Sequence, residues 1–151
     1  MQTNSEAFQG TTDKQLAYAL LRSILGLNIA VHGLSRIYTG VKPFAAAMVP
    51  LFAKTPLPPT SVYFYAASLP FVEAVIGLFV LFGFASRYAY IAGGLVIFSL
   101  TFGSTLRQDW EASGLQLIYA LLYAILLATR EYNKFSIDGW LTAIREKGTI
   151  A

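Results

Sequence analysis

The chain has 151 residues, of which 56% are hydrophobic and 13% are charged, and its formal net charge is +3. Typical soluble domains carry about 25% charged residues, so this composition excludes an ordinary soluble domain and points to a lipid bilayer as the solvent. Lys and Arg lie mostly at the ends of apolar runs, which argues against nucleic-acid binding. The absence of cysteine excludes thiol chemistry carried by this chain.

Residues 1–15, MQTNSEAFQGTTDKQ, are polar and are expected to form a short N-terminal tail and not a cleaved signal peptide. Four apolar stretches follow, and a transmembrane helix needs about 20 residues of this kind. We predict membrane spans at residues 16–38, 61–86, 88–106 and 112–130. The expected fold class is all-α, a four-transmembrane-helix bundle within a membrane domain of residues 16–140, followed by a C-terminal tail at residues 141–151.

The connection between the first two spans, TGVKPFAAAMVPLFAKTPLPPT, is rich in proline, which prevents a long helix. Within it, PFAAAMVPLFAK predicts a short interfacial helix with Phe44, Met48 and Phe52 turned toward lipid. Lys and Arg are more numerous on the side of the two termini and the second loop than on the opposite side. The positive-inside rule then predicts that both termini are cytoplasmic.

Helical periodicity divides the first span into three faces. One face is apolar, is assigned to lipid, and consists of Leu20, Ile24, Leu27, Val31 and Leu34. A second face consists of small residues that let a neighbouring helix approach closely, namely Gly26, Ala30 and Gly33. The third face is polar and consists of Asn28, His32 and Arg36. Because two faces do not suit lipid, we expect this helix to lie between neighbours.

Glu73 lies in the middle of the second span, where a charged carboxylate costs about 2.5–3.5 kcal/mol on insertion scales. Two states of its carboxyl group remain open. It is either neutral because of desolvation, or charged and paired with Arg22, Arg36 or a protonated His32. A permanent ion pair would only fix the packing of the helices, whereas a carboxyl group that exchanges protons or contacts a ligand would mark a functional site.

The fourth span carries Gln116 and Tyr119 on one face at helical spacing. If the first two spans are antiparallel, Glu73 lies close to the depth of Asn28 and His32, which predicts a polar pocket inside the bundle. His32 is either a hydrogen-bonded packing residue or a member of this pocket. One histidine, one intramembrane carboxylate and no cysteine are too few ligands for a zinc or iron site, so neither a metal nor haem is predicted.

Two segments and a short motif resemble a known family. LLRSILGLNIAVHGLSRI supplies Arg22, Gly26, His32, Gly33 and Arg36. FVEAVIGLFVLFGFASRYA supplies Glu73, Gly77, Gly83 and Arg87. Together with FSID at residues 135–138, their order and spacing resemble the DoxX/DoxD-like family of small bacterial membrane proteins, over about residues 16–140. Where that family commonly has lysine, this chain has Arg36, which stays charged and makes bidentate contacts.

The resemblance implies a four-helix protein of the bacterial inner membrane that is linked to redox metabolism. Some relatives are described as small subunits of thiosulfate:quinone oxidoreductase or quinol oxidase, and others are associated with oxidative-stress complexes. Our leading interpretation is a membrane subunit of a redox system that binds a quinone head group in the polar pocket. Glu73 and His32 are then the candidates for proton transfer. The candidates for binding the head group are Asn28, Arg36, Gln116 and Tyr119.

A second interpretation is a non-catalytic assembly or scaffold subunit of a larger membrane complex. It would use the small residues of the first span, and Ser99 with Gly103 of the third, as docking seams. A small-solute transporter is disfavoured, because four spans offer little pathway and the sequence repeats no pair of broken helices. In the first two interpretations we expect a protein partner or a homo-oligomer, and no activity of the chain alone.

Overall fold

The computed structural model describes the backbone of residues 3–149 and the side chains of residues 12–146. This described part is helical, without strands, and its elements run in the order α1 (Thr3–Thr39), α2 (Val41–Met48), η1 (Val49–Phe52), α3 (Pro59–Phe82), α4 (Ser86–Leu106), α5 (Trp110–Ala128), η2 (Arg130–Tyr132) and α6 (Ile137–Thr149). Within it, α1, α3, α4 and α5 are long and apolar enough to cross a membrane. The predicted all-α fold with four spans and a short helix between the first two is confirmed.

Apart from the two ends of the chain, the helix boundaries differ most from the predicted ones at the turn between the second and third spans. α3 ends at Phe82, four residues earlier than expected, because Gly83 adopts φ 63° and closes the helix in the left-handed conformation. α4 begins at Ser86. At the two ends of the chain, the described parts of both expected tails are helical, since α1 reaches back to Thr3 and α6 extends to Thr149.

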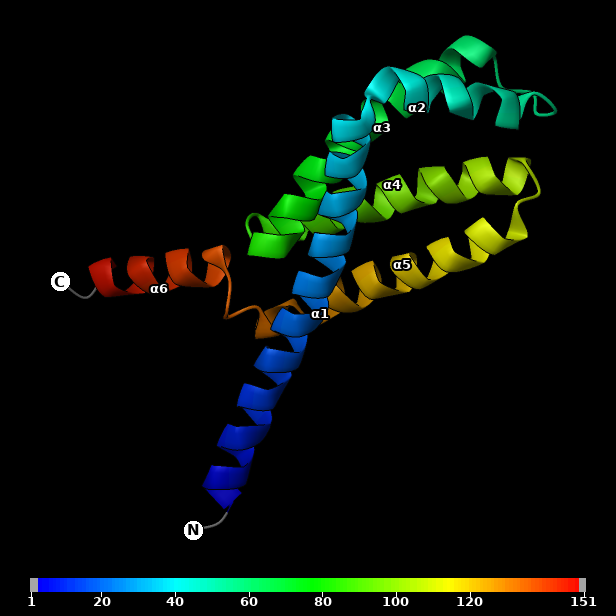
Figure 1. Cartoon of the computed structure of the whole chain (residues 1–151). Coiled ribbons are helices and arrows are strands. Elements are labelled where there is room, and N and C mark those ends of the chain that lie inside the picture. The colour runs from blue at the N-terminus through cyan, green and yellow to red at the C-terminus, as the bar shows by residue number, and fades with distance from the viewer. Residues whose placement is uncertain (1–2, 150–151) are drawn as a thin grey trace.

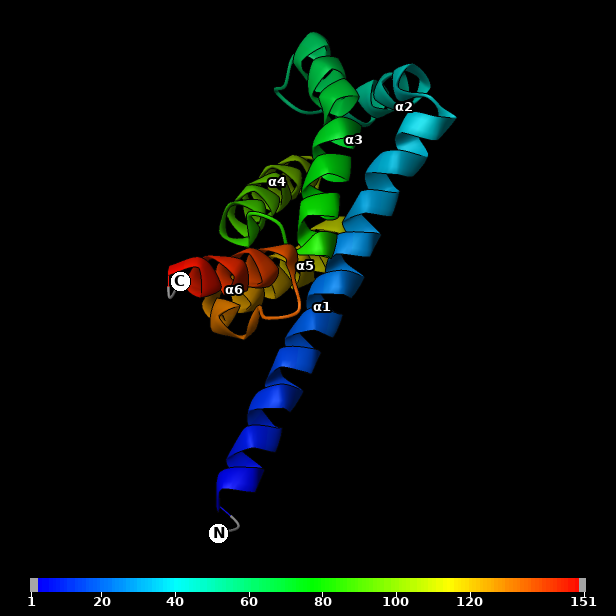
Figure 2. The ribbon, with the colours of Figure 1, turned by 90° about the vertical axis from the view of Figure 1, so that its left-hand side faces the viewer.

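α1 and α3 form an antiparallel pair that runs side by side in both ribbon views (Figures 1 and 2). A Cβ atom added to Gly26 of α1 would lie 2.3 Å from the backbone nitrogen of Leu81. A Cβ atom added to Gly77 of α3 would lie 2.2 Å from the backbone nitrogen of Ala30. The small-residue face predicted in the first span is therefore the seam between α1 and α3, where the two backbones touch.

α4 and α5 form a second antiparallel pair that diverges from the first, so that the four spans make a fork (Figure 1). We call the junction the closed end; it contains the buried residues Tyr18, Tyr90 and Leu126. The Tyr18 hydroxyl donates to the Leu126 carbonyl oxygen at 3.2 Å and lies 2.8 Å from the Tyr90 hydroxyl. These contacts join the first span to the third and fourth.

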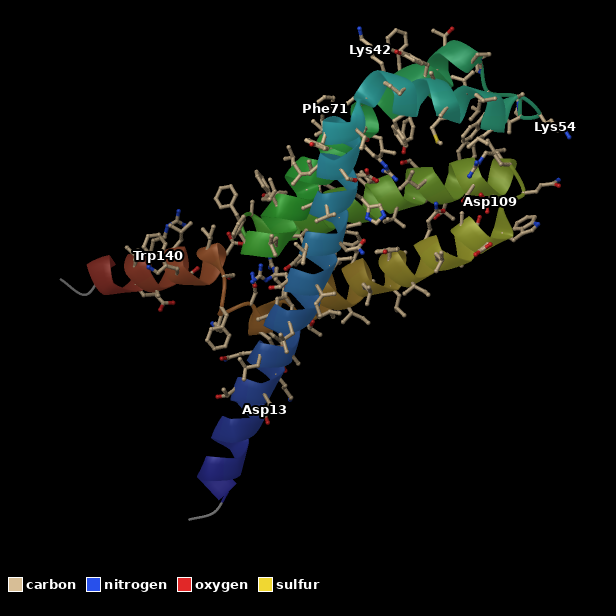
Figure 3. The ribbon with its side chains drawn as sticks, viewed as in Figure 1. Asp13, Lys42, Lys54, Phe71, Asp109 and Trp140 are labelled. Carbon is tan, nitrogen blue, oxygen red and sulfur yellow. The ribbon has the colours of Figure 1, made fainter. Side chains whose placement is uncertain are left out.

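We call the opposite side of the fork, where Arg36 and Arg107 lie, the open end. Here α2 and η1 continue from the end of α1 and extend over α4 (Figure 1). Figure 3 places Lys42, Lys54 and Asp109 at this end, whereas Asp13 lies on the part of α1 that extends beyond the other helices. The open end therefore has a cover made of a segment that does not itself span the membrane.

The expected lipid face of α1 is confirmed. Leu20 is 64% exposed and Ile24 is 66% exposed, although both are large and apolar. On α3, Phe71 is likewise exposed and points away from the other helices (Figure 3). Exposed apolar side chains of this size on every span are what a bilayer, and not water, accommodates.

The expectation that Phe44, Met48 and Phe52 face lipid is wrong. All three are half-buried and line an apolar cavity between α2, η1, α3 and α4. The guanidinium carbon of Arg36 lies 4.7 Å from the centre of the Phe44 ring, and that of Arg107 lies 5.1 Å from the centre of the Phe52 ring. The reason is that α4 diverges from α3, and the apolar surface left between them is covered by the apolar face of α2 and η1.

Candidate functional site

A cavity of about 180 Å³ lies in the fork between the two helix pairs. Its lining includes every residue that the sequence assigned to the polar pocket, namely Asn28, His32, Arg36, Glu73, Gln116 and Tyr119. α1 supplies the first three, α3 supplies the glutamate and α5 supplies the last two. Residues far apart in the sequence are thus brought to one cavity, although their roles toward a ligand stay predictions.

The charged part of this cavity is the ion pair between Arg36 and Glu73. Glu73 is 5% exposed, and its Oε2 accepts a hydrogen bond from a terminal nitrogen of Arg36. Among the three partners considered for this carboxylate, Arg36 is the one that the α1–α3 register brings into contact. The Arg36 side chain is 28% exposed and also stacks on Phe44. The pair therefore links the buried interior to the open end of the fork.

His32 has one ring nitrogen engaged by its own helix. Its Nδ1 lies 2.9 Å from the carbonyl oxygen of Asn28, one turn earlier. A carbonyl oxygen only accepts hydrogen bonds, so Nδ1 carries a hydrogen and, in the neutral ring, Nε2 is an acceptor. Neutral His32 thus suits a ligand hydroxyl, whereas donation from Nε2 to a ligand carbonyl would need the protonated ring.

Asn28 and Tyr119 connect α1 to α5 across the cavity. The Tyr119 hydroxyl donates to Oδ1 of Asn28 at 3.1 Å, and the Asn28 amide group then has its NH2 as a donor toward a ligand. Further toward the open end, the Ser104 hydroxyl donates to Oε1 of Gln116 at 2.7 Å and lies 2.8 Å from the Ser113 hydroxyl. The Gln116 side chain is thereby held by α4 and likewise presents its NH2 group.

The sequence reasoning missed the wall that α4 contributes to the cavity. This wall is apolar and consists of Gly93, Val96, Ile97 and Leu100. A Cβ atom added to Gly93 would lie 2.2 Å from Cζ of Tyr123, so the glycine lets that ring pack against α4. The one signal in the sequence was the Gly93–Gly94 pair within an uncharged span. An apolar wall opposite polar donors gives the cavity the mixed lining that organic ligands require.

Arg22 does not belong to the cavity. It is 4% exposed at the closed end, and it donates hydrogen bonds to the carbonyl oxygens of Val80 at 2.7 Å, Leu81 and, at 2.9 Å, Phe135. The last carbonyl groups of a helix lack partners within the helix and carry a partial negative charge, which a guanidinium group satisfies. Arg22 therefore ties α1 and the chain after α5 to the end of α3.

The FSID motif completes the same closed end. The Asp138 carboxylate accepts hydrogen bonds from the backbone nitrogens of Ala85 at 2.9 Å and Ser86 at 2.8 Å, where α4 begins. The backbone nitrogen of Asp138 donates in turn to the carbonyl oxygen of Gly83 at 3.0 Å. A carboxylate at a helix start satisfies free N–H groups and the helix dipole. The motif is thus a cap for α4 that arrives from another part of the chain.

Comparison with known proteins identifies a family. The DoxX family model matches residues 17–105, which contain the α1–α3 seam, the Arg36–Glu73 pair and the apolar wall of α4. No curated protein and no solved structure matches the chain. The family match covers more than half of the sequence, with the second candidate span and most of the first and third. The chain is therefore a multi-pass membrane protein that belongs to the DoxX family.

Proposed function

We propose that the chain is a membrane subunit of a quinone-linked redox system and that the fork cavity binds a quinone head group. The observation that carries this proposal is the convergence of six polar side chains, including an ion pair, on one small cavity within the membrane domain. Its volume of about 180 Å³ suits a single six-membered ring, because an engineered cavity of about 150 Å³ in another protein binds benzene.

The donors and acceptors of the cavity match both oxidation states of such a ring. A quinone carbonyl accepts hydrogen bonds, for which Arg36 and the NH2 groups of Asn28 and Gln116 are donors. The hydroxyl of the reduced form donates, and Nε2 of neutral His32 is then the acceptor. A bound quinone supplies the capacity to take up two electrons and two protons. In this proposal the Glu73 carboxylate would accept a proton when the reduced ring is oxidised, and the neutral acid would return one when the quinone is reduced, while Arg36 pairs with the charged form.

The electrons come from elsewhere, since the chain contains no cysteine and one histidine. We therefore propose a protein partner as the electron donor or acceptor, and no turnover by the isolated chain. The alternative is a scaffold subunit without a ligand. The two seams suggested for it are both used within the chain, because Gly26 packs on Leu81, and a Cβ on Gly103 would lie 3.3 Å from the Phe52 ring.

The proposed location is the inner membrane of a bacterium, with both termini in the cytoplasm. Arg22 and Arg36 lie within the first span and have partners inside the protein, so they are not counted as flanking charges. The remaining cations favour the side of the termini, which has Lys14, Arg87, Arg130, Lys134, Arg145 and Lys147. The opposite side has Lys42, Lys54 and Arg107. This asymmetry supports cytoplasmic termini under the positive-inside rule.

Single-cysteine labelling tests this orientation. The natural chain has no cysteine, so only the introduced cysteine of this protein can react with the label. In intact cells, a membrane-impermeant maleimide should label Lys54→Cys between α2 and α3. It should label Lys134→Cys, which follows η2, only after the cells are opened. The reverse pattern would overturn the proposed orientation.

The quinone site is tested by native mass spectrometry of protein extracted gently from its own membrane. We expect a quinone-mass adduct on the wild type, its loss in Glu73→Gln, and its retention in Glu111→Gln. The control makes the same exchange at an exposed position of α5. A wild type that carries no quinone under these conditions, and still carries none after added benzoquinone, would refute the head-group site. A stoichiometric partner on an empty bundle would establish the scaffold alternative.

A further inference from the structure

A second cavity, of about 320 Å³, lies beneath α2 and η1 at the open end of the fork. Its walls are the rings and aliphatic side chains of η1, α3 and α4, among them Phe52, Leu69 and Phe102. Its one charged lining residue, Arg107, pairs with Asp109 at 2.9 Å and stacks on Phe52. The lining therefore suits an uncharged, apolar occupant.

The two cavities are neighbours that share part of their walls. Leu100 of α4 and Gln116 of α5 line both of them. The wall between the cavities is made by the side chains of these two residues, and side chains can change rotamer. In the structure, the Gln116 side chain accepts a hydrogen bond from the Ser104 hydroxyl. A molecule in the polar cavity thus has an apolar space directly beside it, on the side away from the closed end.

We propose that this second cavity binds the hydrocarbon chain of the ligand whose ring occupies the polar cavity. The inference rests on the proposed head-group site. The polar cavity of about 180 Å³ suits one ring, and the long chain of a membrane quinone must leave the ring on one side. The apolar cavity is the neighbouring space within the protein, and the chain would reach it between the side chains of Leu100 and Gln116, which line both cavities.

Gly103 provides a selective way to fill the second cavity. It lines that cavity and not the polar one, and a Cβ atom there would lie 3.3 Å from the Phe52 ring. Gly103→Leu is therefore expected to occlude the chain site and leave the head-group residues in place. Gly94→Leu is the matched control on the same helix, because a Cβ atom at Gly94 meets nothing within 4 Å.

The experiment titrates each purified protein, in one detergent, with decyl-benzoquinone and with the matching ring that carries only a methyl group. Partition into micelles is the same for every variant, so it cancels in the ratio of variant to wild-type Kd. We expect Gly103→Leu to raise the Kd of the decyl compound about tenfold or more. The Kd of the methyl compound should change less than twofold, and Gly94→Leu should change neither.

A second variant tests the same site in case Gly103→Leu does not fold. Leu57 lies in the non-helical loop after η1 and lines the same cavity, so Leu57→Trp should reproduce the selective loss. Equal losses for both ligands in well-folded variants, or an unchanged affinity for the decyl compound, would overturn the chain site and leave the head-group site standing. A wild type that binds neither ligand would refute the head-group site, and the chain site with it.

Discussion

The closed and open ends of the fork each use an arginine from α1, but in opposite ways. Arg22 is 4% exposed and donates to backbone carbonyl groups, whereas the Arg36 side chain is 28% exposed and contacts a carboxylate and an aromatic ring. All partners of Arg22 belong to the backbone, so this cation is part of the fold. Arg36 has side-chain partners in a cavity wall. An intramembrane charge therefore indicates function only once its partners are known.

The largest difference between the two ends should appear with Arg22→Met. This change removes the donor to the carbonyl groups of Leu81 and Phe135, while the Val80 carbonyl oxygen keeps the backbone nitrogen of Gly83 as a donor. Each buried unsatisfied group costs about 1–3 kcal/mol. We expect the largest drop in the thermal midpoint of the detergent-solubilised protein, with a loss of monodisperse material. Arg87→Met, at an exposed arginine of α4, is the control. Equal midpoints for the two variants would contradict the role assigned to Arg22.

At the open end, Glu73→Gln removes the charged partner of Arg36. A hydrogen bond to a charged group contributes about 1.5–3 kcal/mol, and Arg36 can turn toward the open end, so the loss should be smaller than for Arg22→Met. The double variant Arg36→Met with Glu73→Met should recover most of the midpoint, because it leaves no unpaired charge. A double variant as unstable as the sum of the single variants would show that the pair does not act as a unit.

Asp138→Ala should weaken the closed end less than Arg22→Met does. The loss of a side-chain cap at a helix start costs about 1 kcal/mol, and the backbone bond from Asp138 to Gly83 remains. The thermal midpoint is again the measurement, with Glu131→Ala at an exposed position as control. If the two variants have the same midpoint, the carboxylate of Asp138 does not stabilise the start of α4.

The smallest effect is expected for Phe52→Leu at the open end. This variant removes the stacking of Arg107 on the ring, and a cation–π contact at an exposed site contributes about 0.5–1 kcal/mol. Phe98→Leu, at a 72% exposed ring of α4, controls for the loss of aromatic area. Limited proteolysis of the segment between α1 and α3 should be faster in Phe52→Leu than in the control. Equal rates would show that the stacking of Arg107 on Phe52 does not stabilise the packing of α2 and η1 on the other helices.

The open end was more predictable from the sequence than the closed end. Asn28, His32 and Arg36 repeat at helical spacing, and the cost of burying Glu73 requires a partner, so the pocket follows from periodicity and charge. Arg22 and Asp138 bind backbone groups, which every residue carries, so no complementary side chain marks their partners. The exception at the open end is its cover, because the apolar pattern of α2 and η1 suits both lipid and protein, and its assignment to lipid was wrong.

The unequal lengths of the helices have a consequence for how the fork sits in a bilayer. The candidate span in α1 has 28 residues and that in α5 has 19, which correspond to roughly 42 Å and roughly 28 Å at 1.5 Å per residue. The hydrocarbon layer is about 30 Å thick. The short helix fits this layer when nearly upright, whereas the long helix must tilt or protrude. If the long helix tilts, the two pairs cross the bilayer at different angles, as they do in the fork, and the polar cavity lies between them.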